Sequence, residues 1–226
     1  FIFGKEITEI SGEKVLAGSE EVASAKVILL TTREADLTAL KDVNLEISDG
    51  NVVANEKMQS SLKNVYVPGD VNGKNLLAHA AFKMGYIAAS EIVEGKSDKY
   101  NNNIIPRAIY TYPEIGSVGL TEEEAKKSYD VKVGKFNYGA NGRALAHGDS
   151  SGMVKIISDA RYGEILGAHI VGPRASELIN EVSILMQSEV IVEEAIKMVF
   201  GHPTFSEAIY EAIADVEGVS VHLPKK

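Results

Sequence analysis

A histidine and a glutamate lie five positions apart near the end of this 226-residue chain, in the run Gly201-His202-Pro203-Thr204-Phe205-Ser206-Glu207. The two side chains can meet only if the backbone between them bends, and a proline directly after the histidine restricts the backbone in a way that favours a bend. A carboxylate beside an imidazole fixes the tautomer of the ring and stabilises the imidazolium once it has taken up a proton. The spacing therefore predicts that His202 is a general base oriented by Glu207.

The same run is also typical of a capped helix start. In that interpretation Thr204 is the N-cap of a helix and Glu207 is the third residue after it. The histidine would then pack or face solvent without taking part in chemistry. Both interpretations remain open on this run alone.

Composition excludes several classes of protein. The chain has 45% hydrophobic and 24% charged residues, no cysteine, and a formal net charge of -9. An acidic chain without a basic stripe cannot displace counterions from phosphates, so we expect no nucleic-acid partner. No apolar stretch reaches the roughly 20 residues that a membrane-spanning helix needs, so we expect a protein of the cytoplasm and no membrane contact.

The first half of the chain predicts short strands followed by one helix. Runs 6–10 and 14–16 flank a Ser-Gly-Glu turn and predict a hairpin, and the apolar run 25–30 predicts a strand buried on both faces. A further strand is expected over 65–70. A helical pattern then covers 75–94 and stops at a glycine, so that this strand, loop and helix together indicate an α/β crossover.

A polar stretch without periodicity, 96–103, indicates a domain boundary. Beyond it we expect strands over 104–112, 131–138, 152–158 and 164–171, and helices over 121–129, 175–189, 192–199 and 206–216. The helix at 121–129 opens with the capping pattern Thr-Glu-Glu-Glu. Strands followed by helices in this way predict an α+β fold, with an antiparallel sheet and helices on one face.

Two separated motifs carry a resemblance to a known family. The His202-Pro203-Thr204-Phe205-Ser206-Glu207 run resembles the C-terminal signature of the pyridine-nucleotide disulfide oxidoreductases, and Tyr66-Val67-Pro68-Gly69-Asp70 resembles their flavin-contacting strand. The intervening segment 110–119 is similar to the entry into the family's interface domain. Within the family, Leu77-Ala78-His79 and Ser206-Glu207-Ala208 are most like the dihydrolipoamide dehydrogenases.

The resemblance implies that the chain is a C-terminal piece of a longer oxidoreductase, divided into three parts. Residues 1–37 would be a remnant of the NAD-binding domain, and residues 38–102 the C-terminal part of the FAD-binding domain. Residues 103–226 would form the interface domain, through which the family makes homodimers. The chain would be inactive alone.

The resemblance also assigns cofactors and the residues that contact them. The full-length enzyme would use FAD and NAD, with Asp70 bound to a ribityl hydroxyl and the backbone of Leu77, Ala78 and His79 near the pyrimidine end of the flavin. The family's glycine-rich dinucleotide loop and its cysteine pair do not occur in this sequence. We therefore expect no tightly bound FAD in this chain, and no histidine spacing predicts a metal site.

By this resemblance, His202 and Glu207 would form the acid–base pair that takes protons from dihydrolipoyl thiols across a homodimer. The lipoyl domains of 2-oxo acid dehydrogenase or glycine cleavage complexes would be the partners. Two alternatives remain open. One is a fragment of a glutathione-reductase-like disulfide reductase. The other is a non-catalytic homodimerisation module, because the apolar faces of 175–189 and 192–199 exceed what one sheet face covers.

Overall fold

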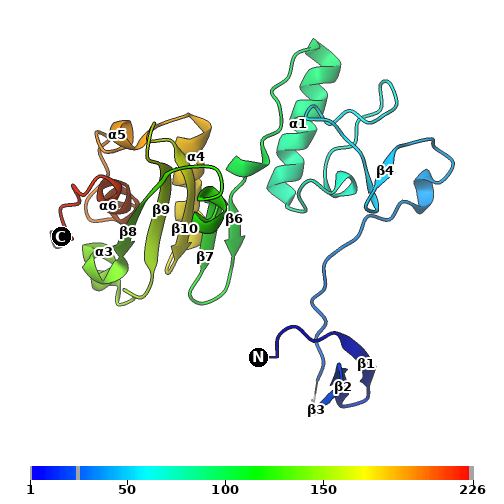
Figure 1. The fold of residues 1–226 in the computed structure, drawn as a ribbon, viewed down its shortest axis with the longest axis horizontal. Helices are drawn as coiled ribbons and strands as arrows, with labels where there is room; N and C mark the ends of the chain where they lie inside the picture. Colours follow the sequence, from blue (N-terminus) through cyan, green and yellow to red (C-terminus); the bar gives the residue numbers. More distant parts are fainter. Residues whose placement is uncertain (1, 24–25, 224–226) are drawn as a thin grey trace.

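The computed structural model describes residues 2–23 and 26–223 and divides them into three parts along the chain (Figure 1). A small sheet lies at the N-terminal end, a central part is built around one long helix, and the C-terminal part contains a five-stranded sheet. An extended segment without helix or strand joins the first two parts.

The five-stranded sheet is the largest element, and every strand pair in it is antiparallel. Its spatial order is β6-β7-β10-β9-β8. The strands are β6 (Arg107–Ile109), β7 (Ile115–Gly119), β8 (Val131–Asn137), β9 (Met153–Asp159) and β10 (Ile165–Val171). The predicted α+β class with an antiparallel sheet is confirmed.

Two helices cover one face of this sheet and build its core. Helix α4 (Ala175–Gln187) packs on β7 and β10, and α6 (Glu207–Val216) packs on β8 and β9. The side chains between the helices and the sheet form one apolar cluster that includes Phe136, Ile156 and Ile170. Because strand residues alternate between faces, Ile157 points the other way, into a smaller cluster with Ala125 and Leu166.

Three short helices complete this part. They are α2 (Glu122–Ala125), α3 (Gly142–His147) and α5 (Val192–Ala195). The predicted cap of the first is confirmed, because Thr121 and Glu124 form a complete capping box. The helices predicted over 121–129 and 192–199 are shorter in the structure, since their last residues form turns rather than α-helix.

The central part is organised by α1 (Ala78–Glu94). The helix ends at Gly95, which has a left-handed backbone and donates its N–H to the carbonyl of Glu91, as the glycine stop predicts. A two-residue hairpin, β4 (Ile47–Ser48) and β5 (Asn51–Val52), turns through Asp49 and Gly50, both with positive φ. Among the described residues, 3-10 helices occur at Thr38–Leu40, Asp70–Asn72, Asn102–Ile104 and Tyr138–Ala140.

The N-terminal sheet differs from the sequence-based expectation. The predicted hairpin is present as β1 (Ile7–Ser11) and β2 (Lys14–Ala17), but the third strand is β3 (Glu20–Ala23). The buried strand predicted over 25–30 is wrong for 26–30, which has no regular structure and carries Ile28 and Leu30 at 76% and 92% exposure; position 25 lies outside the described residues. A strand buried on both faces needs sheet neighbours, and the described residues provide none beside this run.

The strand predicted over 65–70 is also wrong in its extent. The segment forms only an isolated bridge, between Tyr66 and Gln59, together with the backbone bond from Val67 N–H to the carbonyl of Met58. The expected α/β crossover is therefore absent from the described residues, because no parallel strand pairs with this segment there.

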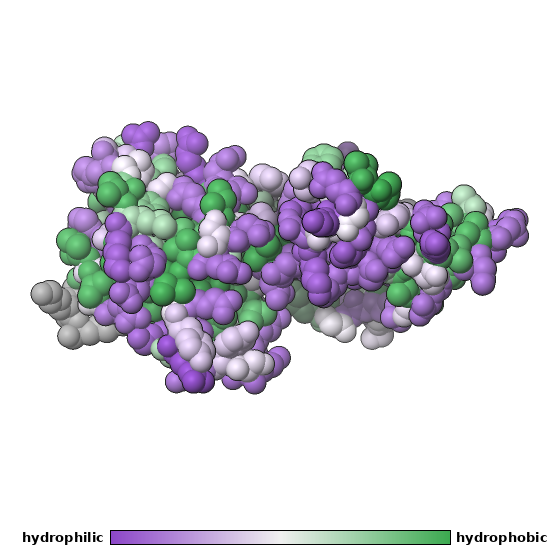
Figure 2. Space-filling model, turned by 90° about the horizontal axis from the view of Figure 1, so that it is seen from above, coloured by the Kyte–Doolittle hydropathy of each residue, from purple (hydrophilic) through white to green (hydrophobic). Residues whose placement is uncertain are grey.

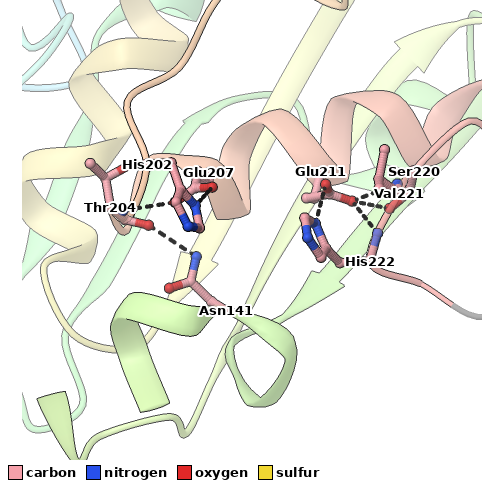
Figure 3. Close-up of polar contacts among 8 residues, drawn as sticks. All are labelled: Asn141, His202, Thr204, Glu207, Glu211, Ser220, Val221 and His222. Carbon is pink, nitrogen blue, oxygen red and sulfur yellow. Dashed lines mark hydrogen bonds and ion pairs between the residues drawn. The ribbon is translucent and has the colours of Figure 1, made fainter. Parts of the chain in front are cut away.

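A buried carboxylate ties the end of the chain to α6. Glu211 is 2% exposed, and its carboxylate accepts hydrogen bonds from Ser220 Oγ, from the backbone N–H of Val221 and His222, and from His222 Nδ1 at 2.8 Å (Figure 3). Burial alone would raise the pKa of Glu211, but the hydrogen bonds from Ser220 and His222 outweigh it and hold this pKa below its ordinary value. The carboxylate thus folds residues 220–222 back onto the helix.

Hydrophobic residues also reach the surface. Figure 2 shows apolar patches separated by polar ones along the whole molecule, most of all over the half that holds the five-stranded sheet. Among the described residues, none of the helices combines the length and the apolar character needed to cross a membrane.

A glycine lets α6 approach the sheet closely, and this generates the first prediction. A Cβ built on Gly134 of β8 would lie 2.0 Å from the carbonyl oxygen of Ala212 on α6. We expect Gly134→Ala to lower the free energy of unfolding by about 1–3 kcal/mol or more, measured by urea titration. A Cβ on Gly139 meets no atom within 4 Å, so Gly139→Ala is the matched control. Equal effects of the two substitutions would contradict this packing.

A second prediction concerns Glu211. Because its pKa is depressed in the folded chain, its contribution is fully present above the ordinary value near 4.5 and is lost as the pH falls through the folded value. We expect the amides of Val221 and His222 to become mobile only in that acid range, measured by the ¹⁵N heteronuclear NOE. Glu211→Gln should release the same residues at neutral pH and cost about 1–3 kcal/mol of stability.

The exposed Glu217, which pairs with Lys132, supplies the control, because Glu217→Gln should leave the C-terminal residues in place. We call the contacts of Glu211 with residues 220–222 the C-terminal clamp. A C-terminal segment that stays ordered in Glu211→Gln would contradict this role of Glu211.

Candidate active site

The predicted histidine and carboxylate meet in the structure. Nδ1 of His202 lies 2.7 Å from Oε1 of Glu207, and Oε2 of Glu207 accepts the backbone N–H of Thr204 at 2.7 Å (Figure 3). An ionised carboxylate can only accept, so Nδ1 carries the proton and Nε2 is the basic nitrogen. The His202 side chain is 75% exposed while that of Glu207 is 20% exposed. The His202 ring is therefore exposed, with Nε2 available to solvent, while the carboxylate that holds it is largely buried.

The turn that joins the two residues follows from their neighbours. The peptide bond between His202 and Pro203 is cis, as is the one between Tyr112 and Pro113. The hydroxyl of Thr204 donates to the carbonyl of Gly201 at 2.7 Å and closes the turn. The predicted capping by the Thr204 side chain is wrong, because its hydroxyl donates to Gly201 and the N-cap of α6 is Ser206. The reciprocal bond of a capping box, from the Thr204 N–H to the Glu207 carboxylate, is present.

Packing holds this turn against the rest of the sheet domain. The ring of Phe205 lies 6.0 Å from the ring of Tyr138 and 5.7 Å from that of His147, measured between centroids. Ser206 Oγ donates to Oε1 of Glu181 on α4 at 2.7 Å. Sequence reasoning identified the pair but missed these supports, since nothing in the spacing of distant residues indicates which of them touch the turn.

Asn141 was missed in the same way. Its side-chain amide donates to the carbonyl of Thr204 at 3.1 Å and links α3 to the turn (Figure 3). A sequence signal does exist for half of its role, because asparagine before a helical run is a strong N-cap. Its contact across 63 residues has no sequence signal.

The predicted cofactor residues lie together in the central part. Arg33 Nη2 donates to the carbonyl of Leu76 at 2.8 Å and lies 3.4 Å from a carboxylate oxygen of Asp70. One guanidinium thus bridges Asp70 and the chain just before Leu77. The Arg33 side chain remains 71% exposed while it makes these contacts.

The first turn of α1 has free backbone donors. Leu77 is its N-cap and makes no side-chain capping hydrogen bond, so the N–H groups of Ala78 and His79 lack a cap. The imidazole of His79 makes a different contact, with Nε2 at 2.7 Å from the carbonyl of Pro106. That side chain joins α1 to the segment that enters the sheet domain.

The two predicted groups of site residues do not meet within one chain. Figure 1 places α6, which carries Glu207, and α1, which begins beside Asp70, on opposite sides of the molecule. None of the hydrogen bonds or ion pairs among the described residues joins the two groups. A reaction that needs both groups would therefore need more than this single chain.

The remaining histidines have structural contacts. Nε2 of His169 lies 3.2 Å from the carbonyl of Leu120, and His222 belongs to the C-terminal clamp. Over residues 2–23 and 26–223 there is no group of three or more His, Asp or Glu side chains that could hold a metal ion.

Two models of one protein family match this chain. The model described as pyridine nucleotide-disulphide oxidoreductase matches residues 1–85, and the model of the dimerisation domain of the same oxidoreductases matches residues 105–213. The second match covers the five-stranded sheet, the helices on it and most of α6.

Curated relatives agree with these matches. The chain is 39% identical over 184 residues to a dihydrolipoyl dehydrogenase of Bacillus subtilis, covering 81% of this chain and 40% of the relative. It is 37% identical over 206 residues to the enzyme of that name from Halobacterium salinarum, covering 89% and 43%, and 35% identical over 209 residues to a mitochondrial one from Sus scrofa, covering 90% and 41%. The chain thus spans less than half the length of these relatives.

Solved structures show the same fold. A crystal structure of LpdA from Mycobacterium tuberculosis matches with a TM-score of 0.85 at 22% identity, covering 93% of this chain and 47% of that one. The HOCl-induced flavoprotein disulfide reductase RclA from Escherichia coli matches with a TM-score of 0.80 at 21% identity, covering 92% and 49%. Because two models of one family together match residues 1–85 and 105–213, the chain belongs to the pyridine nucleotide-disulphide oxidoreductase family.

Proposed function

We propose that this chain acts as the C-terminal part of a dihydrolipoyl dehydrogenase, which oxidises dihydrolipoyl groups and reduces NAD. The names of the relatives from Bacillus subtilis and Halobacterium salinarum support this proposal. The chain supplies the acid–base pair and a dimer surface, and the redox disulfide belongs to sequence that this chain does not contain. The composition favours the cytoplasm as the site of this activity.

The proposal divides the chain at the sequence-predicted boundaries. Residues 1–37 belong to an NAD-binding domain, 38–102 to an FAD-binding domain, and 103–226 to the interface domain. Separate apolar clusters support the second of these boundaries: one is centred on Met58 and Met84, and another on Phe136 and Ile170.

The observation that carries the proposal is the double role of the Glu207 carboxylate. One oxygen holds Nδ1–H of the His202 ring and the other holds the N–H of Thr204, so the basic Nε2 has a fixed direction. A dithiol is mostly protonated at neutral pH and reacts as the thiolate. Nε2 takes the thiol proton, the resulting thiolate attacks a disulfide sulfur, and the other sulfur leaves as a thiolate. Glu207 stabilises the imidazolium until the proton is returned.

The proton acceptor serves a second copy of the protein in this proposal. The support is the separation of α6 from α1 across the sheet domain, which keeps the pair away from the cofactor residues of its own chain (Figure 1). A homodimer would place the His202 ring against the disulfide of its partner. Lipoyl domains of 2-oxo acid dehydrogenase or glycine cleavage complexes would deliver the substrate.

The residues present fit one side of an FAD site. Asp70 offers a carboxylate that can accept a ribityl hydroxyl, and the uncapped amides at Ala78 and His79 can donate to the electron-rich edge of the flavin ring. Arg33 holds Asp70 and the chain before Leu77 in one arrangement. When bound there, FAD would supply the redox chemistry that carries electrons from the dithiol to NAD.

A second function is favoured by exposed apolar side chains on the sheet domain. Ile184 on α4 is 64% exposed and Val199 after α5 is 97% exposed. Such side chains suit burial between two copies of one chain. In this alternative the chain by itself is a homodimerisation module without catalysis. The two functions are compatible, because the first concerns the full-length enzyme and the second concerns this chain alone.

The catalytic proposal predicts the effect of removing the base. In the full-length enzyme, His202→Gln should lower kcat by about 100-fold or more, because positioned bases contribute at least that much. Turnover with dihydrolipoamide and NAD measures it, and His169→Gln is the control, since that ring bonds only a backbone carbonyl. A loss of less than about tenfold would contradict the role of His202. Turnover with glutathione disulfide and NADPH instead would favour the related reductase.

The dimer proposal predicts an effect of charge at the apolar surface. Val199→Asp should raise the dissociation constant of the dimer by about tenfold or more, because burying a valine contributes about 1.5–3 kcal/mol. Sedimentation equilibrium of the 226-residue chain measures this. Ile47→Asp, at an exposed position on the β4–β5 hairpin, is the control. A strict monomer at high concentration would contradict the dimer surface.

A further inference from the structure

Asn141 is a buried polar residue beside the acid–base turn. The residue is 3% exposed, and it lies between the 3-10 helix Tyr138–Ala140 and the first residue of α3. A buried amide needs partners for both its oxygen and its nitrogen. The identity of those partners shows what the residue holds together.

The amide makes two hydrogen bonds in different directions. Its oxygen accepts the backbone N–H of Ala144 at 2.9 Å and thereby caps α3, and its nitrogen donates to the carbonyl of Thr204 at 3.1 Å. Only one orientation of the amide satisfies both partners, because the first is a donor and the second an acceptor. Asn141 therefore ties the start of α3 to the turn.

Thr204 passes this constraint to the acid–base pair. Its carbonyl is held by Asn141, and its N–H is held by Oε2 of Glu207 at 2.7 Å. The other oxygen of the same carboxylate binds Nδ1 of His202. A chain of three hydrogen bonds thus runs from a buried amide to the imidazole, as Figure 3 shows.

The other contacts of this region with the turn are less directional. Tyr138 and His147 pack against the ring of Phe205, and these ring contacts resist separation but do not orient the carbonyl of Thr204. Among the described residues, the bond from Asn141 is the side-chain hydrogen bond that joins segment 138–147 to the turn. The orientation of the Thr204 carbonyl therefore depends on this bond, while the Thr204 N–H is held by Glu207.

We propose that Asn141 is a positioning residue for the His202–Glu207 pair. It acts through the backbone of Thr204 and keeps the Glu207 carboxylate where it selects the Nδ1–H tautomer of His202. The importance of this role rests on the proposed function, in which His202 is the base. The geometry itself does not depend on the proposed function, so the test measures the tautomer of the His202 ring rather than turnover.

The substitution Asn141→Ser separates the two hydrogen bonds. Serine is as good an N-cap as asparagine, so it retains the bond to Ala144, but its side chain is too short to reach the carbonyl of Thr204. The readout is the ¹⁵N spectrum of the His202 ring in the 226-residue chain, which distinguishes a protonated from an unprotonated Nε2. We expect the ratio of the Nδ1–H to the Nε2–H tautomer to fall by about twofold to tenfold, the size of one lost hydrogen bond.

A matched control removes an asparagine cap elsewhere. Asn101 caps the 3-10 helix Asn102–Ile104 through its side chain and has no contact with the turn. Asn101→Ser should leave the His202 spectrum unchanged. A purely structural role of Asn141 predicts lower stability with an unchanged tautomer ratio, and that result would overturn the proposal.

The unmodified chain provides a test that does not depend on the variant folding. A scalar coupling across the hydrogen bond between Asn141 Nδ2 and the carbonyl carbon of Thr204 is expected, and its absence would also overturn the proposal. These outcomes are independent of the turnover of His202→Gln. An altered tautomer ratio in Asn141→Ser together with undiminished turnover of His202→Gln would reject the proposed function and retain the positioning role.

Discussion

The arrangement of this site depends on one carboxylate that is shared between a side chain and the backbone. Glu207 binds the ring of His202 with one oxygen and the N–H of Thr204 with the other. A carboxylate bound only to the imidazole would move with it, whereas the second bond anchors the pair to the turn. The orientation of the His202 ring is therefore fixed relative to the backbone of its own turn.

Helix α6 connects this pair to the remainder of the sheet domain. It carries Glu207 in its first turn and Glu211 one turn later, and each carboxylate holds a histidine (Figure 3). Close contact with β8 at Gly134 fixes the position of the helix on the sheet. The acid–base geometry is therefore linked to the packing of the antiparallel sheet rather than to a mobile loop.

The central part presents a different situation. Arg33 brings Asp70 and the start of α1 together, yet the apolar run around Leu30 lies exposed. A run of this composition suits burial between sheet neighbours, and the described residues contain no strand beside it. The chain matches less than half the length of its relatives. A partly formed cofactor site beside an exposed apolar run is consistent with that.

The sequence by itself determined the elements that depend on local chemistry. The α+β class, the capping box at Thr121 and the glycine stop of α1 follow from neighbouring residues and their periodicity. The spacing of His202 and Glu207 predicts that they can meet, but it also suits a capped helix start. Tertiary structure alone decided the contact of Asn141 with Thr204, because its partners are 63 residues apart. It also decided that run 26–30 is not a strand. A strand forms only where another strand accepts and donates its backbone hydrogen bonds, and no local sequence pattern shows whether that second strand is present.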